Sequence, residues 1–418
     1  MKHNISIIEN GIVCRMPYRI FSYFAWPSVA CADDGTLMVA CSGLRTAHVD
    51  PFGKVVMYKS TDNGKTWSGP HLLIDTPLDD RDAGIVNIGN SEFIVTSFNN
   101  TRKQQYEWAD AGWAYTKEIG AMCRGYLDNV TDDMEERYLG SLVIKSSDNG
   151  HTWSDVYKVP VSAPHGPTLR RDGTLLYAGT PLCAEEQLST GTQLSSGTQL
   201  STGTQLCADT PSCTDKQLCA DTPSCTDTRL CEMNPSGERP ILIYTSSDGL
   251  NYARLCDIPA CDDPRAAGMQ HSEPHILELK NGRIVLHIRI ESGDAHFGGR
   301  LFSLCQSVSD DGGKSFSVPK LLENNGAPPH LMQHSSGTVV CSYGRRIPPY
   351  GISAMLSSDN CDTWDMEHAI WANGISGDLG YPCSVELPGG DIFTAYYAAL
   401  PGDGHKCSIL WTRWRIGA

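Results

Sequence analysis

The sequence lacks several features that would place it in common functional classes. None of its apolar runs approaches the roughly 20 residues with which an α-helix crosses a bilayer. It has no segment rich in lysine and arginine, and its formal net charge is −15, which excludes binding to the phosphates of nucleic acids. The first residues carry a charge but no continuous apolar segment and no small-residue cleavage site. We therefore expect a cytoplasmic protein without a signal peptide and without a membrane partner.

Cysteine is abundant, but its pattern does not favour a disulfide framework. The 418-residue chain has 17 cysteines, an odd number. Most of them stand singly in apolar segments, as Cys31, Cys41, Cys305 and Cys341 do. Such positions are typical of reduced, buried thiols.

Turn residues are frequent and indicate an all-β protein. The chain has 40 glycines and 24 prolines, which favour many hairpins over long helices. A pattern Ser-x-Asp-x-Gly-x-x-Trp/Phe recurs, in which glycine suits a left-handed turn, aspartate hydrogen-bonds the turn and the aromatic ring packs between strands. The copies are Ser60, Asp62, Gly64, Trp67; Ser146, Asp148, Gly150, Trp153; Ser309, Asp311, Gly313, Phe316; Ser357, Asp359, Cys361, Trp364; and a copy one residue short, Ser247, Asp248, Gly249, Tyr252.

A second repeat consists of strand–turn–strand units with an apolar second strand. Its six copies lie at 32–39, 88–95, 170–177, 279–286, 334–341 and 387–394. Repeats at this spacing are typical of the blades of a propeller. The sequence therefore predicts a single domain over residues 1–418, folded as a six-bladed β-propeller.

One segment interrupts the repeats between the third and fourth units. Residues 183–232 repeat a six-residue phase, first Gln-Leu-Ser-Thr-Gly-Thr and then Cys-containing. Regularly spaced thiols would suit a metal-binding or adhesive arm. A repeat-expanded surface loop is the favoured interpretation, because lengthening a loop costs little closure entropy and the Cys-x-x-Cys spacing of metal sites is missing from this tract.

Candidate functional residues follow from the expected architecture, since propellers place side chains at the ends of inner strands and in the loops between blades. Polar groups cluster in four such places, each with a structural alternative such as a turn, an edge salt bridge or a packed ring. The residues at these four places are Arg45, His48 and Asp50; Glu273 and Arg289; Arg345 and Arg346; and Tyr381. His48, His271 and His275 lack the spacing of metal ligands, so we expect no metal and no cofactor.

With these residues the chain resembles the bacterial sialidase (neuraminidase) family of six-bladed propellers with Asp-box repeats. The resemblance covers nearly the whole chain outside residues 183–232. It implies that Asp50 is the acid/base residue, Glu273 the base that activates Tyr381, and Tyr381 the nucleophile of a retaining exo-α-sialidase. Arg289 and Arg346, the latter preferred over Arg345, would hold the carboxylate of a sialylated glycan or another carboxylated sugar.

The chain departs from the family at Ala25, where a first arginine is expected in the sequence Phe24-Ala25-Trp26-Pro27. Three guanidinium groups normally hold the sialic acid carboxylate through charge-assisted hydrogen bonds. Arg19 or Arg45 would have to replace the missing one, and His48 is a further substrate-binding candidate. Two other functions stay open: a non-catalytic carbohydrate-binding propeller, and a glycosidase for a different sugar.

Aromatic residues near these loops offer surfaces for a sugar ring. Trp26, Trp108 and Trp113 are candidates for stacking, although Trp26 suits the core of a blade equally well. The acidic segment from Trp108 to Arg137 is expected to be a loop between blades that covers the site.

Overall fold

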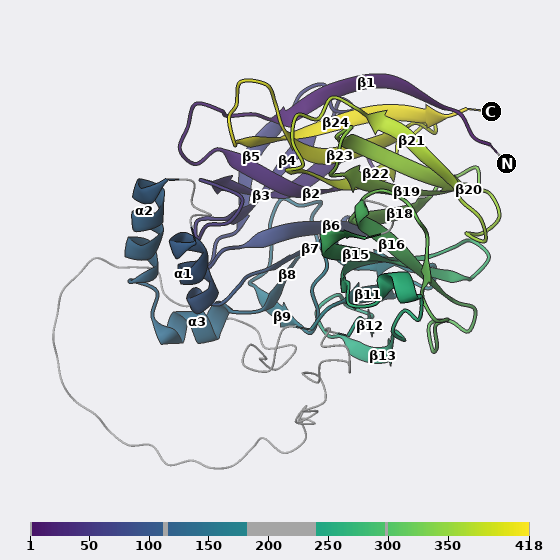
Figure 1. The fold of residues 1–418 in the computed structure, drawn as a ribbon, viewed down its shortest axis with the longest axis horizontal. Helices are drawn as coiled ribbons and strands as arrows, with labels where there is room; N and C mark the ends of the chain where they lie inside the picture. The colour runs from purple at the N-terminus through teal and green to yellow at the C-terminus, as the bar shows by residue number, and fades with distance from the viewer. Residues whose placement is uncertain (1, 112–115, 182–239, 297–299, 418) are drawn as a thin grey trace, which may run out of the picture.

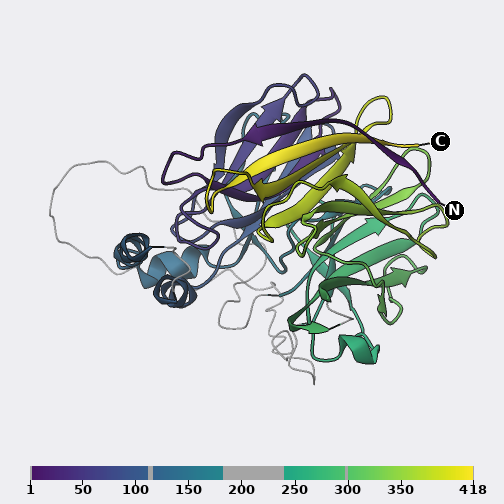
Figure 2. The same cartoon turned by 45° about the horizontal axis from the view of Figure 1, so that its top comes forward.

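The strands of this protein form six antiparallel sheets that follow one another around a central axis. The computed structural model describes residues 2–111, 116–181, 240–296 and 300–417. Each sheet has four strands, and the six sheets are the blades of a β-propeller. In Figures 1 and 2 the blades succeed one another in chain order, and the yellow C-terminal strand lies beside the purple N-terminal strand. The expected fold is confirmed.

The first five blades each take four consecutive strands from the chain, starting with the innermost. Blade one has β2 (Tyr23–Cys31), β3 (Leu37–Arg45), β4 (Lys54–Ser60) and β5 (Ser68–Ile74). Blade two has β6 (Arg81–Gly89), β7 (Glu92–Phe98), β8 (Ser141–Ser146) and β9 (Tyr157–Val159). Blade three has β10 (Thr168–Leu169), β11 (Leu175–Gly179), β12 (Leu242–Ser246) and β13 (Ala253–Asp257).

The remaining blades close the ring. Blade four has β14 (Gln270–Glu278), β15 (Ile284–His296), β16 (Arg300–Ser309) and β17 (Lys320–Leu321). Blade five has β18 (Pro329–Gln333), β19 (Val339–Arg345), β20 (Gly351–Ser357) and β21 (Asp365–Trp371). Blade six has β22 (Leu379–Glu386), β23 (Ile392–Ala399), β24 (Cys407–Ile416) and, as its outer strand, the N-terminal β1 (Ile5–Cys14).

The pairing of β1 with β24 joins the two ends of the chain in one sheet. Ile5 lies opposite Ile416, and Cys14 lies opposite Ile409. The six predicted hairpins connect the first and second strands of the six blades. Residues 183–232 lie outside the described residues, and the strands that flank them in the chain, β11 and β12, pair directly. A long insertion at a hairpin therefore leaves the sheet of blade three intact.

The Ser-Asp-Gly repeats form the turns between the third and fourth strands of blades one to five. In the first of them, the Ser60 hydroxyl donates to Asp62 at 2.8 Å and accepts from the backbone N–H of Gly64 at 2.9 Å. In the shortened copy the prediction of Ser247 was wrong: Ser246 makes these bonds with Asp248 and Gly249. Blade six has no such turn, because its fourth strand comes from the N-terminus.

Three helices lie between β7 and β8, the second and third strands of blade two. The expectation of a loop between blades at this place was wrong. The helices are α1 (Arg102–Asp110), α2 (Lys117–Leu127) and α3 (Asp132–Tyr138), and in Figure 1 they stand together at one side of the propeller. Each begins after a threonine, Thr101, Thr116 or Thr131, whose hydroxyl accepts from a backbone N–H of the first turn. Threonine N-caps are a local sequence signal for the start of a helix, and they could have predicted these three helices. No helix within the described ranges is long and apolar enough to span a membrane.

Apolar side chains fill the space between adjacent blades. Met38 and Met57 of blade one, for example, pack with Phe93 and Leu142 of blade two. Cys41, Cys305 and Cys341 are buried, and the cysteines of the described part of the chain are free of disulfides. Burial of this kind in each interface makes the blades one structural unit.

Three buried histidines lie between the inner strands. His275 and His330 have ring centroids 4.4 Å apart, and His165 lies 5.0 Å from His330. Ser28 of β2 bonds to the Nδ1 of His165 at 2.9 Å, and Ser384 of β22 donates its N–H to the Nδ1 of His330 at 3.3 Å. Burial, followed by the effect of neighbouring histidines, lowers the pKa of all three rings well below the usual value.

We expect the protein to lose stability as the pH falls below about 6.5, the ordinary pKa of histidine. Below it the unfolded chain binds protons that the folded chain excludes, so the free energy of unfolding falls by up to about 1.4 kcal/mol per pH unit for each histidine. Denaturant unfolding at about pH 7.5 and about pH 5.5 measures this loss. His330→Asn removes one of the three groups and should reduce the difference between the two pH values; an unchanged difference would contradict the assignment.

Candidate functional site

Four inner strands distort at the same place, near their beginning. The residues there have a left-handed backbone: Trp26 in β2 (φ 52°), Asp82 in β6 (φ 40°), Glu273 in β14 (φ 48°) and Tyr381 in β22 (φ 48°). At each of them the pairing with the neighbouring strand shifts by one residue, which is a β-bulge. A bulge changes the direction of a side chain, and a left-handed non-glycine residue costs about 1–3 kcal/mol. Strain at four equivalent positions marks a functional site.

Proline is part of the local cause of three of these bulges. Pro27, Pro274 and Pro382 directly follow the distorted tryptophan, glutamate and tyrosine. Proline has no N–H to donate to a sheet ladder and is therefore confined to edges and bulges. Within inner strands, an aromatic or acidic residue followed by proline is thus a sequence signal for this site.

Glu273, Tyr381 and Arg289 form one hydrogen-bonded group. The Tyr381 hydroxyl donates to the Oε1 of Glu273 at 2.6 Å. The Nη1 of Arg289 donates to the Oε2 of Glu273 and, at 3.2 Å, to the Tyr381 hydroxyl. The Nη2 of the same arginine pairs with Glu291. Burial, followed by the negative charge of Glu273, raises the pKa of Tyr381 well above its usual value, so the phenol is neutral and needs a base to become a nucleophile.

The two adjacent arginines of blade five point in different directions. Arg346 lies over the ring of Tyr381, 5.7 Å from its centroid, and donates from Nε to Leu379 O and from Nη2 to the Tyr397 hydroxyl. Arg345 instead pairs at 3.5 Å with Glu367 of the outer strand β21. Within the described residues the Nη1 of Arg346 has no hydrogen bond, which leaves it available to a ligand beside Tyr381.

Asp82, which was not among the residues predicted from the sequence, lies near enough to Glu273 and Arg289 for their charges to act on its carboxyl group. It is 5% exposed, and its Oδ1 has no hydrogen-bond partner in the described part of the chain. Burial raises its pKa to about 7, against the effect of Arg81 and with that of the Glu273 charge. An unpartnered, buried carboxyl group whose pKa is raised is a candidate for proton transfer.

Asp50 has a different environment from the one its predicted role requires. Its carboxylate accepts hydrogen bonds from the backbone N–H groups of Thr46, Ala47 and Phe52 and from the Thr46 hydroxyl. It is 3% exposed, and these four bonds, all from its own loop, occupy it fully. These contacts tie Asp50 to its own loop, and its role as acid/base residue stays a prediction.

Neither proposed substitute for the missing arginine reaches Tyr381. Arg45 is fully buried in a bidentate pair with Asp79. Arg19 is exposed in the turn between β1 and β2, in a small pocket with Arg15 and Tyr18. Ala25 itself is fully buried, so it presents no side chain to a ligand.

Trp26 occupies the bulge of blade one, and two arginine side chains lie over its ring; the guanidinium of Arg45 is 4.9 Å from its centroid. The guanidinium of Arg81 lies 4.4 Å from the Trp26 centroid and 5.9 Å from that of Trp108 in α1. The centroids of Trp26 and Tyr381 are 6.4 Å apart. The helical segment between β7 and β8 therefore reaches the site through Trp108, whereas Trp113 lies outside the described residues.

His48 belongs to a neighbouring polar network. Its Nδ1 lies 2.8 Å from the Tyr23 hydroxyl and 3.0 Å from Asp378, and its ring packs edge-on against Trp26 at 4.9 Å. Tyr397 also donates to Asp378, at 3.2 Å. Through Tyr397 this network fixes Arg346, so His48 supports the wall of the site.

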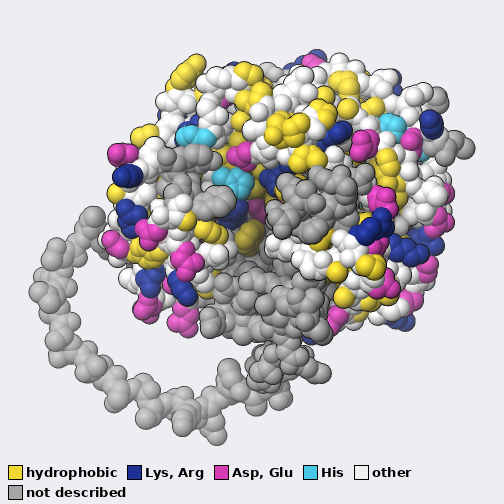
Figure 3. Space-filling model, in the orientation of Figure 1, with side chains coloured by type: hydrophobic (Ala, Val, Ile, Leu, Met, Phe, Trp, Pro, Cys, Tyr) yellow, Lys and Arg dark blue, Asp and Glu magenta, His cyan; other side chains and the backbone are white. Residues whose placement is uncertain are grey.

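One face of the molecule has a hollow near its middle. Figure 3 shows side chains of both charges on the walls of this hollow. The Glu273 side chain is 23% exposed, whereas that of Arg289 is 8% exposed, so the carboxylate is accessible while the arginine lies behind it. Arg289 pairs with both Glu273 and Glu291, whereas burial raises the pKa of Asp82 and favours its neutral form.

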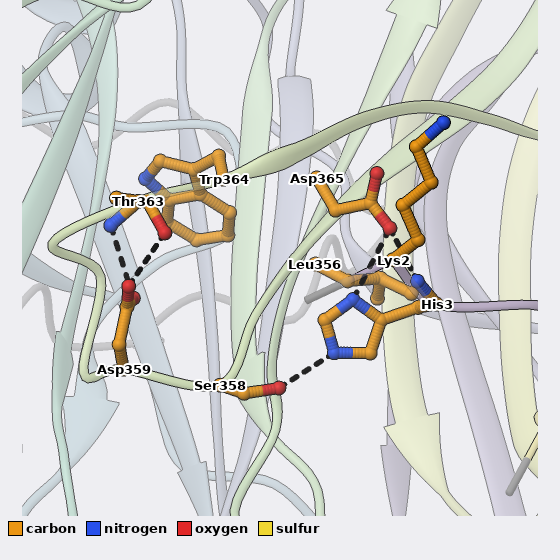
Figure 4. Close-up of a pocket in the computed structure, with 8 residues that line it drawn as sticks. All are labelled: Lys2, His3, Leu356, Ser358, Asp359, Thr363, Trp364 and Asp365. Atoms are coloured by element: carbon orange, nitrogen blue, oxygen red, sulfur yellow. Dashed lines mark hydrogen bonds and ion pairs between the residues drawn. The ribbon is translucent and has the colours of Figure 1, made fainter.

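Another pocket, of about 460 Å³, lies away from this site at blade five. Figure 4 shows that His3 bonds there to Asp365 and, at 2.6 Å, to Ser358. Asp365 also contacts His368 at 3.2 Å. These groups fasten the N-terminal segment to the outer strand β21, which is a structural role.

Comparisons with known proteins support the fold. No family model matches the sequence, and no curated protein matches it. The chain is similar in structure to a protein of unknown function from Dyadobacter fermentans DSM 18053, with a TM-score of 0.68, 19% identity and 99% of both chains covered. It is also similar to the NanB sialidase of Streptococcus pneumoniae, with a TM-score of 0.56, 11% identity, and 97% of this chain and 70% of that chain covered.

An arabinan-degrading enzyme shares the same architecture. The α-L-arabinanase of Penicillium chrysogenum, complexed with arabinobiose, has a TM-score of 0.55 and 13% identity, with 97% of this chain and 98% of that chain covered. At such identities the likeness shows the six-bladed propeller alone. The chemistry of this chain has to be argued from its own residues.

Proposed function

We propose that this protein is a retaining glycosidase that removes a terminal sialic acid, or a related carboxylated sugar, through Tyr381 as nucleophile. The observation that carries the proposal is the 2.6 Å hydrogen bond from the Tyr381 hydroxyl to Glu273. Both residues are held in a strained backbone conformation and are bridged by Arg289. A purely structural role for these side chains would not require strain at four equivalent bulges.

The reaction proceeds in two displacements. As the Tyr381 oxygen bonds to the anomeric carbon, its proton passes to Glu273, and protonated Asp82 donates to the departing glycosidic oxygen. In the second step Asp82 takes a proton from water, the water oxygen displaces Tyr381, and Glu273 returns its proton to the phenolate. Two inversions give net retention.

The choice of tyrosine supports an anionic substrate. A carboxylate nucleophile would be repelled by a carboxylate on the anomeric carbon, and sialidases use tyrosine instead. Arg346, with Nη1 unoccupied beside Tyr381, would bind that substrate carboxylate, and Arg289 would add a second positive charge. Ala25 stands where a third arginine is expected, so we expect weaker carboxylate binding than a three-arginine site provides.

A glycosidase for a neutral sugar is the second candidate, favoured by one observation. Ala25 stands where a third carboxylate-binding arginine is expected, and a neutral sugar has no carboxylate for that arginine to bind. The similarity in fold to an arabinanase is compatible with this alternative.

A panel of fluorogenic glycosides distinguishes the two candidates. We expect release of the fluorophore from α-sialosides or 2-keto-3-deoxy sugars, and none from α-L-arabinofuranosides. Arg346→Ala should raise KM for the carboxylated substrate about tenfold or more, because one charge-assisted hydrogen bond is lost. Arg345→Ala is the matched control, since Arg345 pairs with Glu367 away from the site. Hydrolysis of neutral glycosides alone would reject the proposed substrate.

A further inference from the structure

Blade four brings two thiols and an imidazole together outside the Glu273–Tyr381 site. Cys261 precedes the 3₁₀-helix η3 (Pro264–Ala266), His271 lies in β14 and Cys305 lies in β16. The sulfur atoms of the two cysteines are 3.7 Å apart. The metal-ligating atoms of all three residues lie within 4.8 Å of one another. Three segments separated in the chain thus converge on one point.

The distance between the sulfurs fits a shared metal ion better than a disulfide bond. Two thiolates bound to zinc at about 2.3 Å, with a tetrahedral angle between them, have sulfur atoms about 3.8 Å apart. A disulfide bond is about 2.05 Å long. The observed 3.7 Å matches the first value and exceeds the second by far.

The surroundings also suit a soft metal ion. Met269, Ile290 and Leu321 pack around Cys305, which is fully buried, while Cys261 and His271 are partly buried. Two thiolates in an apolar environment need a compensating positive charge, because burial of an uncompensated charge is costly. Cysteine sulfur with imidazole nitrogen is a typical ligand set for zinc.

We propose that Cys261, His271 and Cys305 bind one Zn²⁺ ion. The spacing of His48, His271 and His275 predicted no metal, and the three ligands form no local motif because they come from a loop and two strands. The pairing of β14, β15 and β16 brings His271 near Cys305, and the loop before η3 adds Cys261.

The ion would stabilise the strand that presents the candidate base. His271 precedes Glu273 by two residues, and its neighbour Ser272 pairs with Arg289 across the sheet. Zinc would tie the start of β14 to β16 and to the loop after β13, directly beside the strained bulge. Its role is therefore positional, and it takes no part in the proposed reaction steps.

Cobalt substitution tests the proposal on the full chain. Protein purified without chelator or reductant is analysed for zinc, then exchanged with Co²⁺, and the thiolate-to-cobalt charge-transfer band is titrated. We expect wild type to bind one more equivalent of tetrahedral cobalt than Cys261→Ser. The measured quantity is the difference in bound cobalt between wild type and Cys261→Ser, because the cysteines of residues 183–232 can bind metal in both proteins.

Cys256→Ser provides the matched control, since Cys256 is partly buried in the neighbouring β13 and its thiol bonds to Gly313 O. It should retain the full cobalt signal. His271→Gln provides a second variant if Cys261→Ser is insoluble, and it should lose the same equivalent. Equal metal content in wild type and variant, or a Cys261–Cys305 disulfide in peptides mapped without reduction, would overturn the proposal.

Discussion

Replacement of Tyr381 by phenylalanine should lower kcat by roughly a thousandfold or more, with little change in the affinity for substrate. The substitution removes the oxygen that donates to Glu273 at 2.6 Å and leaves the ring, which packs near Trp26 and Tyr397, in place. Without that oxygen no covalent glycosyl–tyrosine intermediate can form. Steady-state rates, together with mass spectrometry of protein trapped with a 2,3-difluorinated substrate analogue, measure both consequences.

Tyr396, in the neighbouring strand β23, offers a matched control, because the same loss of a buried hydroxyl can be made there. Its hydroxyl is also buried and bonds to Thr412 at 2.9 Å, but its side chain packs in a different cluster, between blades five and six. Tyr396→Phe should cost about 1 kcal/mol of stability for the lost hydrogen bond and leave kcat unchanged. Wild-type turnover by Tyr381→Phe, or an adduct on another residue, would refute Tyr381 as nucleophile.

Substitution of Asp82 by asparagine should lower kcat by about 10²- to 10⁴-fold on substrates with a poor leaving group. The pKa of Asp82 is raised to about 7 by burial, so its protonated, proton-donating form decreases as the pH rises through 7. We expect the wild-type rate of the first displacement to fall above this pH. In Asp82→Asn that alkaline limb should disappear, and an activated leaving group such as a nitrophenol should restore much of the rate.

Asp50→Asn distinguishes the two aspartates. Because the Asp50 carboxylate receives four hydrogen bonds from its own loop, its loss should lower the melting temperature and keep the alkaline limb near pH 7. If the limb vanishes in Asp50→Asn and persists in Asp82→Asn, Asp50 resumes the role of acid/base residue that the resemblance assigned to it.

The architecture was predictable because its determinants are local. A turn that needs glycine, aspartate and serine at fixed positions can be recognised in the sequence. Five such turns and six hairpins together predict six blades. The threonine N-caps of α1, α2 and α3 are local signals too, although the three helices were not predicted from them. The fifth turn was misassigned by one residue, since Ser246 and Ser247 are equivalent in sequence and differ only in their hydrogen bonds.

The sequence by itself determined the six blades, their closure into a propeller and a short set of polar candidates, Glu273, Arg289, Arg346 and Tyr381 among them. Tertiary structure decided which groups meet: it hydrogen-bonded Tyr381 to Glu273 and Arg289, brought Asp82 within the influence of the Glu273 charge, and joined Cys261, His271 and Cys305. The physical reason is that a turn depends on adjacent residues, whereas these groups meet through bulges and strand pairings between distant segments. Such contacts, together with burial, determine the pKa of each side chain and where it points. Neither can be predicted from the residues adjacent in the sequence.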